Sequence, residues 1–527
     1  MLPALALALH VYTSTDDVRA LAIAPDGALV EATTGGLVVG GRLVRAGAAR
    51  AILVDGRAIL YATDEGVREL GADGLVSSAR ASALARFRGA LVAGAPAGFP
   101  RRERTTALAE VDGALLVGTL GKGLYRWDGR RAARVAGVDA LVWDIQADAA
   151  GAWVATADGL ARVDRRGRRA ADSAAARSRA LPVADIRVVR VDRGRPVVGT
   201  FGGGAWGWDG AAWRPLGPSD LRVQALALRP DGAAVLGTPE GTVEIAADGG
   251  VARPVRRGLP ANDLSALAAT PDGGAWVGTF DRGLFRVDAA GRVVAAFTER
   301  DGLLDDRVNA LALGPDGDLA IATERGLCFR RAGGGFDAVE PLGAHVATVA
   351  IVGGTVYAGM PKGLFSLARG RLARAPGFPL RRVTAIAPIA AEDGLPRYVG
   401  TAEGLALRVA GAWKIVRAAA GALPDDWITA IAPLPGGAAL LGSYNAGLAR
   451  AFPDGRIERD AAGAWVNPGA LAVTADRVLI GTLETGLWMN GIRLAGLPHE
   501  DVTAVVPTAG GYWIATRGGL ARLDTSR

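Results

Sequence analysis

Short apolar stretches alternate with tight turns along the whole chain, and one pattern returns repeatedly. It is clearest in VRALAIAPDGALVEATTGGL from Val18, LSALAATPDGGAWVGTFDRGL from Leu264 and VNALALGPDGDLAIATERGL from Val308. Small apolar residues alternate there with branched or polar ones, which is the period of a β-strand. The separators P-D-G and G-T-x-x-G are turn sequences, because Pro presets one φ and Gly supplies a positive one. The pattern predicts short strands joined by tight turns.

Each copy of this repeat predicts a blade of four antiparallel strands. The shared form V-x-A-L-A-x-x-P-D-G-x-x-x-V-G-T-x-x-G-L-x-R-x-D supplies three strands, and a looser stretch such as VVAAFTE supplies the fourth. The glycine near its end recurs fourteen times between Gly36 and Gly519, about 37 residues apart, close to the length of a propeller blade. A helical solenoid is disfavoured, because no ten-residue segment keeps a helical period free of Gly or Pro. We predict an all-β chain of two tandem seven-bladed β-propellers, with fourteen four-stranded antiparallel blades.

Ring closure decides the predicted domain boundary. The last copy ends in GLARLDTSR without a fourth strand, whereas LALHVYTS near the start is a fourth strand without a copy. A shared blade removes the unpaired sheet edges of an open ring. We predict a first propeller over residues 1–290, completed by LALHVYTS, and a second over residues 291–527, completed by VVAAFTE. The alternative is a crossed closure, in which the N-terminal strand pairs with the C-terminal blade. Because only 25 residues separate Gly98 from Gly123, we expect the third copy to lack a strand.

Composition excludes several classes of protein. Half of the 527 residues are hydrophobic and 21% are charged, so the chain can bury a core. The single cysteine, Cys328, cannot form an intramolecular disulfide or a thiolate zinc site, and we interpret it as a buried, inert thiol. His10, His345 and His499 lie far apart in the sequence, without the spacing of metal ligands. We expect no cofactor, no bound metal and no catalytic residues.

A net charge of +7 and a pI near 9.9 raise the question of a nucleic-acid partner. The densest basic run lies between Arg162 and Arg179, and it lacks the interleaved aromatic residues of single-strand binders. We interpret this run as a solvated hairpin and expect no nucleic-acid partner. No apolar stretch reaches the roughly 18 residues of a transmembrane helix, so we expect no membrane span.

The blade sequence resembles the two-component regulator propeller repeat of bacterial sensor proteins, which carry paired seven-bladed propellers. The resemblance is carried by PDGGAWVGTFDRGLFRVD from Pro271, DGALLVGTLGKGLYRWDG from Asp112 and DAAGAWVATADGLARVD from Asp148, and it covers nearly the whole chain. It implies a sensor-type or scaffold propeller in the periplasm or outside the cell. In that family a transmembrane helix and a kinase or regulator follow; with neither in this sequence, we expect a stand-alone pair of propellers. The start, MLPALALALH, lacks the basic residues and cleavage site of a signal peptide. We interpret it as a strand, with a signal remnant as the alternative.

Function on a rigid scaffold is expected at variable positions that share one face. If the first strand of each copy lines the channel, the loops before it and the turns between the second and third strands share such a face. The second residue of V-x-A-L points near the channel mouth, where aromatic, Arg and amide groups can recognise a small ligand, a glycan or a protein. The predicted ligand- or partner-binding residues are Lys122, Trp143, Arg187, Phe201, Phe280, Asp281, Arg282, Trp427, Tyr444, Asn445, Glu484 and Arg517.

These observations predict a non-enzymatic ligand- or protein-binding propeller module of sensor or scaffold type. The alternative is a propeller lyase or hydrolase acting at the channel mouth. Two titratable side chains within hydrogen-bond reach of each other and of a pocket would favour the enzyme.

Overall fold

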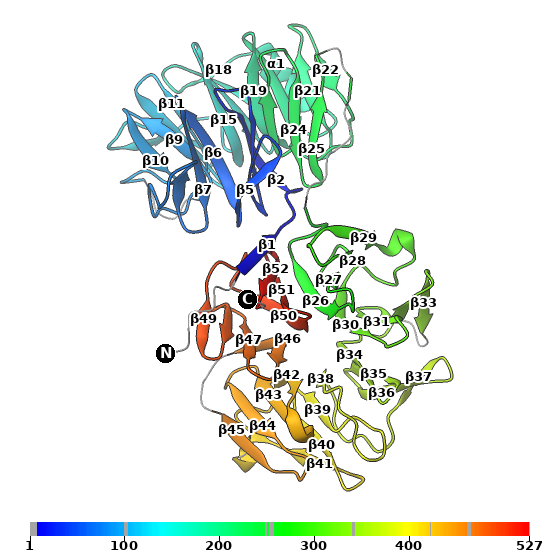
Figure 1. Ribbon diagram of the computed structural model, residues 1–527. Helices are drawn as coiled ribbons and strands as arrows, with labels where there is room; N and C mark the ends of the chain where they lie inside the picture. The colour runs from blue at the N-terminus through cyan, green and yellow to red at the C-terminus, as the bar shows by residue number, and fades with distance from the viewer. Residues whose placement is uncertain are drawn as a thin grey trace. The chain divides into compact units, whose positions relative to one another are not determined.

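The computed structural model is built almost entirely of β-strands, which group into fourteen antiparallel sheets (Figure 1). The predicted fold of two seven-bladed β-propellers is confirmed. Among the described residues, helix is limited to α1 (Ser173–Arg177) and four single-turn 3₁₀ helices. The structure describes residues 8–99, 104–247, 250–251, 258–339, 343–421, 423–460 and 465–525.

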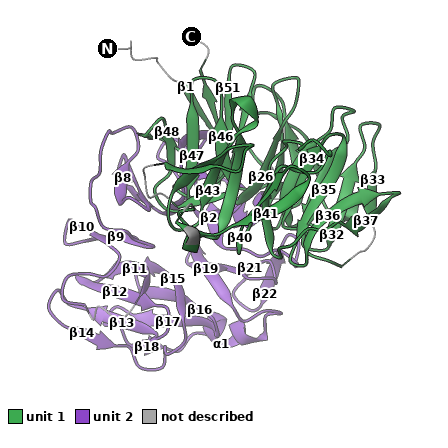
Figure 2. Ribbon diagram, turned by 90° about the horizontal axis from the view of Figure 1, so that it is seen from below, with its two compact units in different colours: residues 1–13, 258–527 green, residues 14–257 purple. Residues whose placement is uncertain are grey.

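One compact unit, called here the N-terminal ring, spans residues 14–257 and is purple in Figure 2. The first strand of each of its sheets contacts the first strand of the next sheet, and the last sheet contacts the first. Its seven sheets are β2 (Val18–Ile23), β3 (Leu29–Thr33), β4 (Gly36–Val39) and β5 (Arg42–Ala46); β6 (Ala49–Asp55), β7 (Ala58–Thr63) and β8 (Val67–Glu69); β9 (Leu84–Phe87) and β10 (Ala90–Ala93); β11 (Thr105–Val111), β12 (Ala114–Thr119), β13 (Leu124–Trp127) and β14 (Ala132–Arg134); β15 (Val142–Asp148), β16 (Gly151–Thr156), β17 (Gly159–Asp164) and β18 (Arg169–Ala170); β19 (Ile186–Asp192), β20 (Arg195–Thr200), β21 (Ala205–Trp208) and β22 (Trp213–Leu216); and β23 (Ala225–Leu228), β24 (Ala234–Thr238) and β25 (Gly241–Ile245).

The other compact unit, called here the C-terminal ring, combines residues 1–13 with residues 258–527 and is green in Figure 2. Its first strands also form a closed circle of neighbours. Its seven sheets are β26 (Leu264–Ala269), β27 (Ala275–Thr279), β28 (Leu284–Val287) and β29 (Val293–Phe297); β30 (Val308–Leu313), β31 (Leu319–Thr323), β32 (Gly326–Arg330) and β33 (Phe336–Val339); β34 (Thr348–Val352), β35 (Thr355–Met360), β36 (Gly363–Ala368) and β37 (Arg371–Arg374); β38 (Val383–Ile386), β39 (Tyr398–Thr401), β40 (Gly404–Val409) and β41 (Ala412–Val416); β42 (Ile428–Pro433), β43 (Ala439–Ser443), β44 (Leu448–Ala451) and β45 (Ile457–Asp460); β46 (Val466–Val473), β47 (Val478–Thr482), β48 (Leu487–Met489) and β49 (Ile492–Leu494); and β50 (Val502–Thr508), β51 (Gly511–Thr516), β52 (Gly519–Asp524) and β1 (Ala8–Tyr12).

The repeated G-T-x-x-G sequence makes the turn between the second and third strands of a blade, called here the b–c turn. In the blade that begins at β26, the Thr279 hydroxyl donates a hydrogen bond of 2.9 Å to the carbonyl of Gly283. A Cβ on Gly283, which has φ +76, would lie 2.2 Å from the carbonyl oxygen of Phe297. Glycine is therefore required at this turn by both its backbone angle and the close approach of the fourth strand.

The glycine of the V-G-T sequence sets the packing of one blade on the next. A Cβ on Gly278 would lie 2.6 Å from a methyl group of Val308, which begins the inner strand of the following blade. The same contact joins the last blade of the N-terminal ring to the first, because a Cβ on Gly237 would lie 2.7 Å from a methyl group of Val18. The V-x-A-L and V-G-T parts of the repeat are thus complementary halves of the blade interface.

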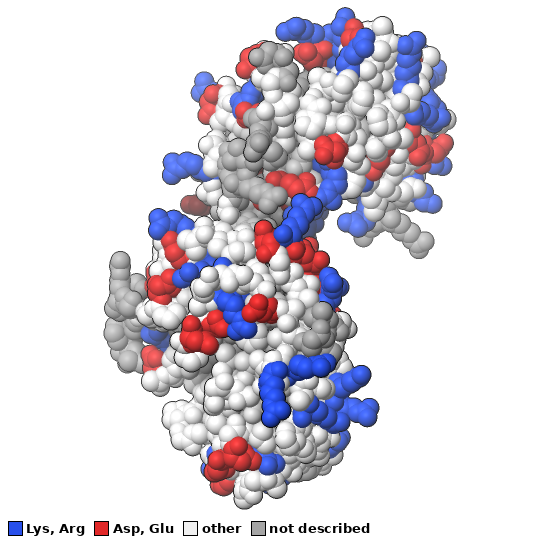
Figure 3. All heavy atoms as spheres, turned by 90° about the vertical axis from the view of Figure 1, so that its right-hand side faces the viewer, with Lys and Arg blue, Asp and Glu red and all other residues white. Residues whose placement is uncertain are grey.

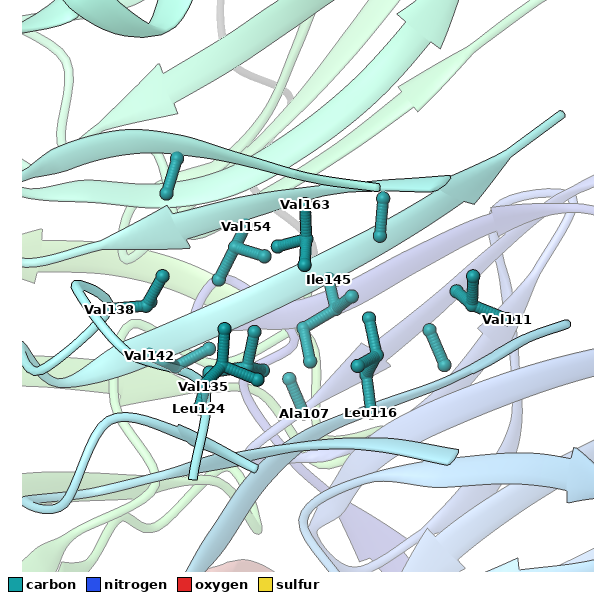
Figure 4. Packing of buried hydrophobic residues seen from close by; sticks show 13 residues of the cluster. Ala107, Val111, Leu116, Leu124, Val135, Val138, Val142, Ile145, Val154 and Val163 are labelled. Atoms are coloured by element: carbon teal, nitrogen blue, oxygen red, sulfur yellow. The ribbon is translucent and has the colours of Figure 1, made fainter. Parts of the chain in front are cut away.

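Apolar side chains from neighbouring blades fill the space between the sheets. In the cluster of Figure 4, Leu116 and Leu124 of one blade face Ile145, Val154 and Val163 of the next. All five are nearly or completely buried. Each blade interface is therefore a small core of its own, built from branched aliphatic residues.

The crossed closure is the one observed, and the predicted boundary at residue 290 is wrong. β1 pairs antiparallel with β52, from Ala8 opposite Asp524 to Tyr12 opposite Leu520, and Figure 1 shows the two strands side by side. β29, which was expected to begin the second propeller, pairs with β28 in the first blade of the C-terminal ring. Eight copies of the repeat precede residue 290, and seven blades fill each ring, so the eighth copy opens the C-terminal ring.

The N-terminal ring closes by side-chain packing between its first and last blades. Val18, Leu21 and Leu29 form one buried cluster with Ala225, Ala227 and Val235. Among the residues that the structure describes, no strand is shared between these two blades. The N-terminal ring is therefore inserted in sequence between the last strand of the C-terminal ring's closing blade, β1, and its first blade.

Not every blade has the four strands that the repeat predicts. Within the described ranges, eleven sheets have four strands, the sheets of β6–β8 and β23–β25 have three, and the sheet of β9 and β10 has two. The two-stranded sheet belongs to the third copy, where the short spacing before Gly123 predicted a missing strand. Residues 100–103, which follow β10, lie outside the described residues.

The structure also shows the environment of Cys328 and the character of the helices. Cys328 is buried, and burial raises the pKa of its thiol to about 11, in agreement with the interpretation as an inert thiol. In the described part of the chain, no helix has the length and apolar character needed to cross a membrane.

Candidate functional site

The second residue of each V-x-A-L sequence, called here the mouth position, is set by a β-bulge. In β2 the strand pairing skips from Val18 to Ala20, and in β19 it skips from Ile186 to Val188. Equivalent irregularities follow the first residue of β6, β11, β15, β26, β30, β38, β42, β46 and β50. A bulge leaves one residue unpaired and re-aims its side chain. In these eleven blades the bulge therefore turns one side chain toward the channel.

In the N-terminal ring the mouth positions of all seven blades line one cavity, called here the N-terminal mouth. Its volume is about 460 Å³, within the range of small-molecule sites. The prediction that the second residue of V-x-A-L points to the channel mouth agrees with this arrangement. The seven residues are Arg19, Arg50, Ser82, Thr106, Trp143, Arg187 and Gln224.

The C-terminal ring has a cavity of similar size, about 470 Å³, called here the C-terminal mouth. Six of its seven mouth positions line it, and all six side chains are uncharged and mostly small. They are Ser265, Asn309, Ala347, Thr384, Asn467 and Thr503. The two mouths therefore share a construction but differ in chemistry.

Small polar residues at the mouth position fasten one blade to the next. Thr384 and Thr429 each donate a hydrogen bond of 2.5 Å to the carbonyl that begins the next inner strand, at Ile428 and Val466. The same contact, called here the blade latch, is made by Ser82, Thr106, Ser265, Asn309 and Asn467. Five of these seven latches lie in the C-terminal ring and two in the N-terminal ring.

The latch makes a testable contribution to stability. Thr429 is fully buried, so Thr429→Val should lower the free energy of unfolding of the C-terminal ring by about 1–3 kcal/mol, since the Val466 carbonyl loses its donor. Thermal denaturation followed by circular dichroism measures this loss.

Thr503 supplies a matched control for that substitution. It occupies the mouth position of another blade and is 8% exposed, but its hydroxyl has no hydrogen-bond partner among the described residues. Thr503→Val should therefore change stability by less than about 0.5 kcal/mol or raise it, because a buried hydroxyl without a partner is unfavourable. Equal losses in the two variants would show that the latch does not stabilise the ring.

Arg187 is held on three sides at the N-terminal mouth. Its guanidinium lies 3.7 Å from the ring centre of Trp143 and 4.5 Å from that of Phe201. Asp185 accepts hydrogen bonds from Nε and Nη2 of Arg187, at 2.9 and 2.7 Å. The other oxygen of Asp185 accepts from Nε1 of Trp143 at 2.7 Å. Stacking and ion pairing together orient this guanidinium before any ligand arrives.

A second polar cluster crosses the seam between the last and first blades of the N-terminal ring. Asp17 accepts hydrogen bonds from Nη2 of Arg19 at 2.5 Å and from Nε2 of Gln224 at 3.0 Å. Arg50 on the next blade pairs with the exposed Asp64 at 2.5 Å. Each mouth arginine therefore has one carboxylate partner, which leaves part of its five N–H donors available.

In the C-terminal mouth, Arg517 lies between two carboxylates and an aromatic ring. Its Nη1 atom is 2.8 Å from Asp263, its Nε atom is 3.5 Å from Asp501, and its guanidinium lies 4.4 Å from the ring centre of Phe280. Burial raises the pKa of Asp263, although the hydrogen bond from Arg517 opposes the change. Two carboxylates on one guanidinium leave this corner with an excess of acceptors.

His345 gives the C-terminal mouth a titratable pair. Nδ1 of His345 is 2.9 Å from a carboxylate oxygen of Glu324, and the amide nitrogen of Asn309 lies 3.5 Å from the same ring nitrogen. His345 lines the cavity and is partly exposed. This arrangement meets the condition that the sequence analysis set for an enzyme, and no histidine was among the predicted site residues.

Three aromatic rings stack on two neighbouring blades of the C-terminal ring. The ring centres of Trp427 and Tyr444 are 4.3 Å apart at an angle of 21°, and those of Tyr444 and Trp465 are 6.5 Å apart at 7°. Trp465 is 45% exposed. Asn445, next to this stack, donates its backbone N–H to Asp425 at 3.1 Å. These residues lie outside the residues that line the C-terminal mouth.

The structure brings together four of the twelve predicted site residues at the two mouths. Trp143 and Arg187 line the N-terminal mouth, and Phe280 and Arg517 line the C-terminal mouth. Phe201 reaches the N-terminal mouth only through its contact with Arg187. The other seven do not line either cavity, namely Lys122, Asp281, Arg282, Trp427, Tyr444, Asn445 and Glu484.

Some cavity residues were missed because their copies depart from V-x-A-L. Arg50 lies in A-R-A-I, Ser82 in A-S-A-L and Asn467 in V-N-P-G, so none matched the consensus. Aligning the copies on the b–c turn glycine would have placed Arg50 and Ser82, which precede that glycine by 16 residues as Trp143 does, at the mouth position. His345 and Asp501 precede the mouth positions by two residues, a spacing that puts both side chains on one side of a strand.

Charged side chains of both signs are distributed over each ring in the face that Figure 3 shows. Among the described residues, no group of three or more His, Cys, Asp or Glu side chains has the arrangement of a metal site.

Comparison with known proteins shows the fold alone. No family model and no curated protein matches the chain. PorZ, an essential bacterial surface component of the type-IX secretion system of Porphyromonas gingivalis, has a TM-score of 0.71 and 14% identity over 98% of this chain and 87% of its own. An ancestral GH74 enzyme has a TM-score of 0.66 and 11% identity over 98% of this chain and 99% of its own. The extracellular domain of the putative hybrid two-component system BT3049 from B. thetaiotaomicron also matches, with a TM-score of 0.42 and 15% identity over 97% of this chain and 83% of its own.

Proposed function

We propose that this chain is a non-enzymatic binding module that takes a small ligand in its N-terminal mouth. One observation carries the proposal. Two of the seven mouth positions in the N-terminal ring make a blade latch, whereas the other five carry long or aromatic side chains that line the cavity. These five are Arg19, Arg50, Trp143, Arg187 and Gln224.

Giving up the latch has a cost that a purely structural ring would avoid. A hydrogen bond of this kind contributes about 1 kcal/mol. Trp143 and Gln224 replace it with side-chain hydrogen bonds to the next blade, at Asp185 and Asp17, whereas Arg19, Arg50 and Arg187 have no hydrogen bond to the next blade among the described residues. Positions where a sequence departs from its own local rule are expected at functional sites. In the C-terminal ring, by comparison, five of the seven mouth positions make the blade latch.

The N-terminal mouth also has the properties of a preformed site. Its arginines are already oriented by Asp17, Asp64 and Asp185, so little side-chain freedom is lost on binding. A cavity of about 460 Å³ accommodates a small molecule or one residue of a larger partner.

The indole N–H of Trp143 offers a direct test, because it donates to Asp185 at the wall of the cavity. The full chain is labelled with ¹⁵N, and the Trp143 signal is assigned from the Trp143→Phe variant. Pools of acidic, basic and neutral metabolites are then added. We expect at least one pool to shift the Trp143 signal. The indole N–H of Trp213, which donates to the carbonyl of Ala174 in α1, is the control, and its signal should not change. A library that leaves the Trp143 signal unmoved, or that shifts it equally in Arg187→Thr, contradicts the proposal.

A second candidate function rests on His345 and Glu324 in the C-terminal mouth. If Nδ1 of His345 donates to Glu324, Nε2 is left to accept a proton, which is the arrangement of a general base. The predicted alternative, a lyase or hydrolase acting at the channel mouth, would use this pair. Turnover of ester or glycoside test substrates that disappears in His345→Gln, and remains in His499→Gln, would support it. Equal turnover in both variants, or none in the unmodified chain, would exclude it for those substrates.

A further inference from the structure

We infer that the ligand of the N-terminal mouth is a small molecule with two or more carboxylate or phosphate groups. The inference rests on the proposed function and names the chemistry of its ligand. It follows from the donors that the cavity presents, from the charges around them and from the contrast with the C-terminal mouth.

Three guanidinium groups reach the N-terminal mouth from separate blades. Arg19 lies in β2, Arg50 lies in β6 and Arg187 lies in β19. Arginine stays protonated at every relevant pH and carries donors in a planar fork that matches carboxylate and phosphate oxygens. Arg19 and Arg50 lie on neighbouring blades, whereas the β23 blade separates Arg187 from Arg19. A ligand that uses all three guanidinium groups therefore needs acidic groups at more than one point.

The carboxylates beside these arginines do not exhaust their donors. Asp185 uses Nε and Nη2 of Arg187, and the ring centres of Trp143 and Phe201 lie 3.7 and 4.5 Å from the guanidinium. Nη1 of Arg187 has no hydrogen-bond partner among the described residues. The two rings shield part of the guanidinium from water, which strengthens a hydrogen bond to Nη1.

The rim of the N-terminal mouth carries additional positive charge. Arg80 and Arg104 precede the mouth residues Ser82 and Thr106 by two positions, the spacing that puts Asp17 and Asp185 beside their arginines. Both are exposed, as is Lys122 on a b–c turn. Within the described ranges, none of these three cations has an ion-pair partner. These three cations add positive charge beside the mouth arginines, and carboxylates of the b–c turns, such as Asp64 and Asp158, offset part of it.

The C-terminal mouth lacks these features and is a built-in comparison. No arginine occupies any of its mouth positions, and the donors of Ser265, Asn309, Thr384 and Asn467 are used by blade latches. Its one lining guanidinium, Arg517, is flanked by two carboxylates. Anion binding is therefore assigned to the N-terminal mouth alone.

Isothermal titration calorimetry with the full chain tests the inference, at about 50 mM NaCl so that screening is weak. Citrate and pyrophosphate are the probes, and the tighter of the two identifies carboxylate or phosphate as the preferred group. Putrescine, a dication, and betaine, which has no net charge, are the matched non-anionic compounds. We expect both anions to bind, with an affinity that falls as salt rises, and neither control compound to bind.

Two triple variants with the same change in net charge locate the site. Arg19→Thr with Arg50→Thr and Arg187→Thr places a latch-forming residue type at each mouth position. Arg165→Thr with Arg166→Thr and Arg168→Thr removes three exposed arginines from the hairpin before α1. We expect the mouth variant to bind the anions at least about 30-fold more weakly, and the hairpin variant to bind like the unmodified chain. Melting temperatures report whether each variant is folded.

The outcomes separate the ligand's chemistry from the function of the site. Equal binding by the mouth variant, or an equal loss in the hairpin variant, overturns the inference. If neither anion binds while a neutral or cationic metabolite shifts the Trp143 signal, the ligand class is wrong and the proposed function stands. If neither anion binds and no metabolite shifts that signal, both are wrong.

Discussion

Removal of residues 1–13 is expected to destabilise the C-terminal ring by about 3–6 kcal/mol, because β52 loses its partner strand. Five residue pairs join β1 to β52, and the Tyr12 ring packs 5.8 Å from that of the buried Trp513. The newly unpaired edge of β52 should also promote aggregation. Among the described residues before the N-terminal ring, β1 is the strand that joins this ring's closing blade.

Hydrogen–deuterium exchange distinguishes the two rings in that experiment, because a single melting curve mixes them. Protection should fall across residues 258–525 and remain unchanged across residues 18–245. A peptide with the sequence of residues 7–13, added in excess, should restore part of the lost protection. Loss of protection in the N-terminal ring, with the C-terminal ring unaffected, would contradict the observed closure.

Excision of residues 14–257, with Thr13 joined to Gly258 through two glycines, is expected to leave a folded seven-bladed propeller. The two chain ends already meet, because the backbone N–H of Leu259 donates to the carbonyl of Thr13 at 3.1 Å. Both ends belong to the C-terminal ring, so the junction requires no rearrangement of its blades. Size-exclusion chromatography and circular dichroism should report a monomer rich in β-structure.

The boundary predicted from the sequence supplies the control for this excision. Removing residues 14–290 also deletes β26, β27 and β28, so that six complete blades remain for a ring built of seven. We expect that variant to be insoluble or unfolded. If the shorter chain folds and the longer one does not, the division of the chain described here is incorrect.

The periodicity of the sequence was sufficient to predict the blades, but it could not assign each blade to one of the two rings. Thr279 and Gly283 make a turn whose contacts lie within one blade, so the turn can be recognised from a few residues. Closure depends on which edge a single strand meets. ALHVY of β1 and VVAAF of β29 have similar alternation, and nothing local distinguishes β52 from β28 as the partner of β1. Counting the copies before residue 290 would have shown that a ring ending there holds eight blades.

The candidate site was predicted in part for a similar reason. A mouth position follows from a β-bulge at a constant place in the repeat, so Trp143 and Arg187 could be found by spacing. The b–c turns share the correct face but extend from it, and residues such as Lys122 and Glu484 therefore miss the cavities. The latch could not be foreseen, because it depends on the distance between a hydroxyl and a carbonyl of another blade.

The two rings show how one repeat can serve both stability and recognition. At Thr429 the bulged side chain fastens two blades, and at Arg187 the same bulge presents a charged group to a cavity. A change of one residue type at a constant backbone position therefore converts a structural contact into a potential binding group. The arrangement of the N-terminal mouth is the consequence of five such changes in a single ring.

A crystal structure of the full chain, grown with the tighter of citrate and pyrophosphate, tests the central claim most directly. The account predicts that the anion lies in the N-terminal mouth, with oxygen atoms within hydrogen-bond distance of at least two of Arg19, Arg50 and Arg187. An anion bound elsewhere, with the N-terminal mouth empty at a saturating concentration, would contradict it.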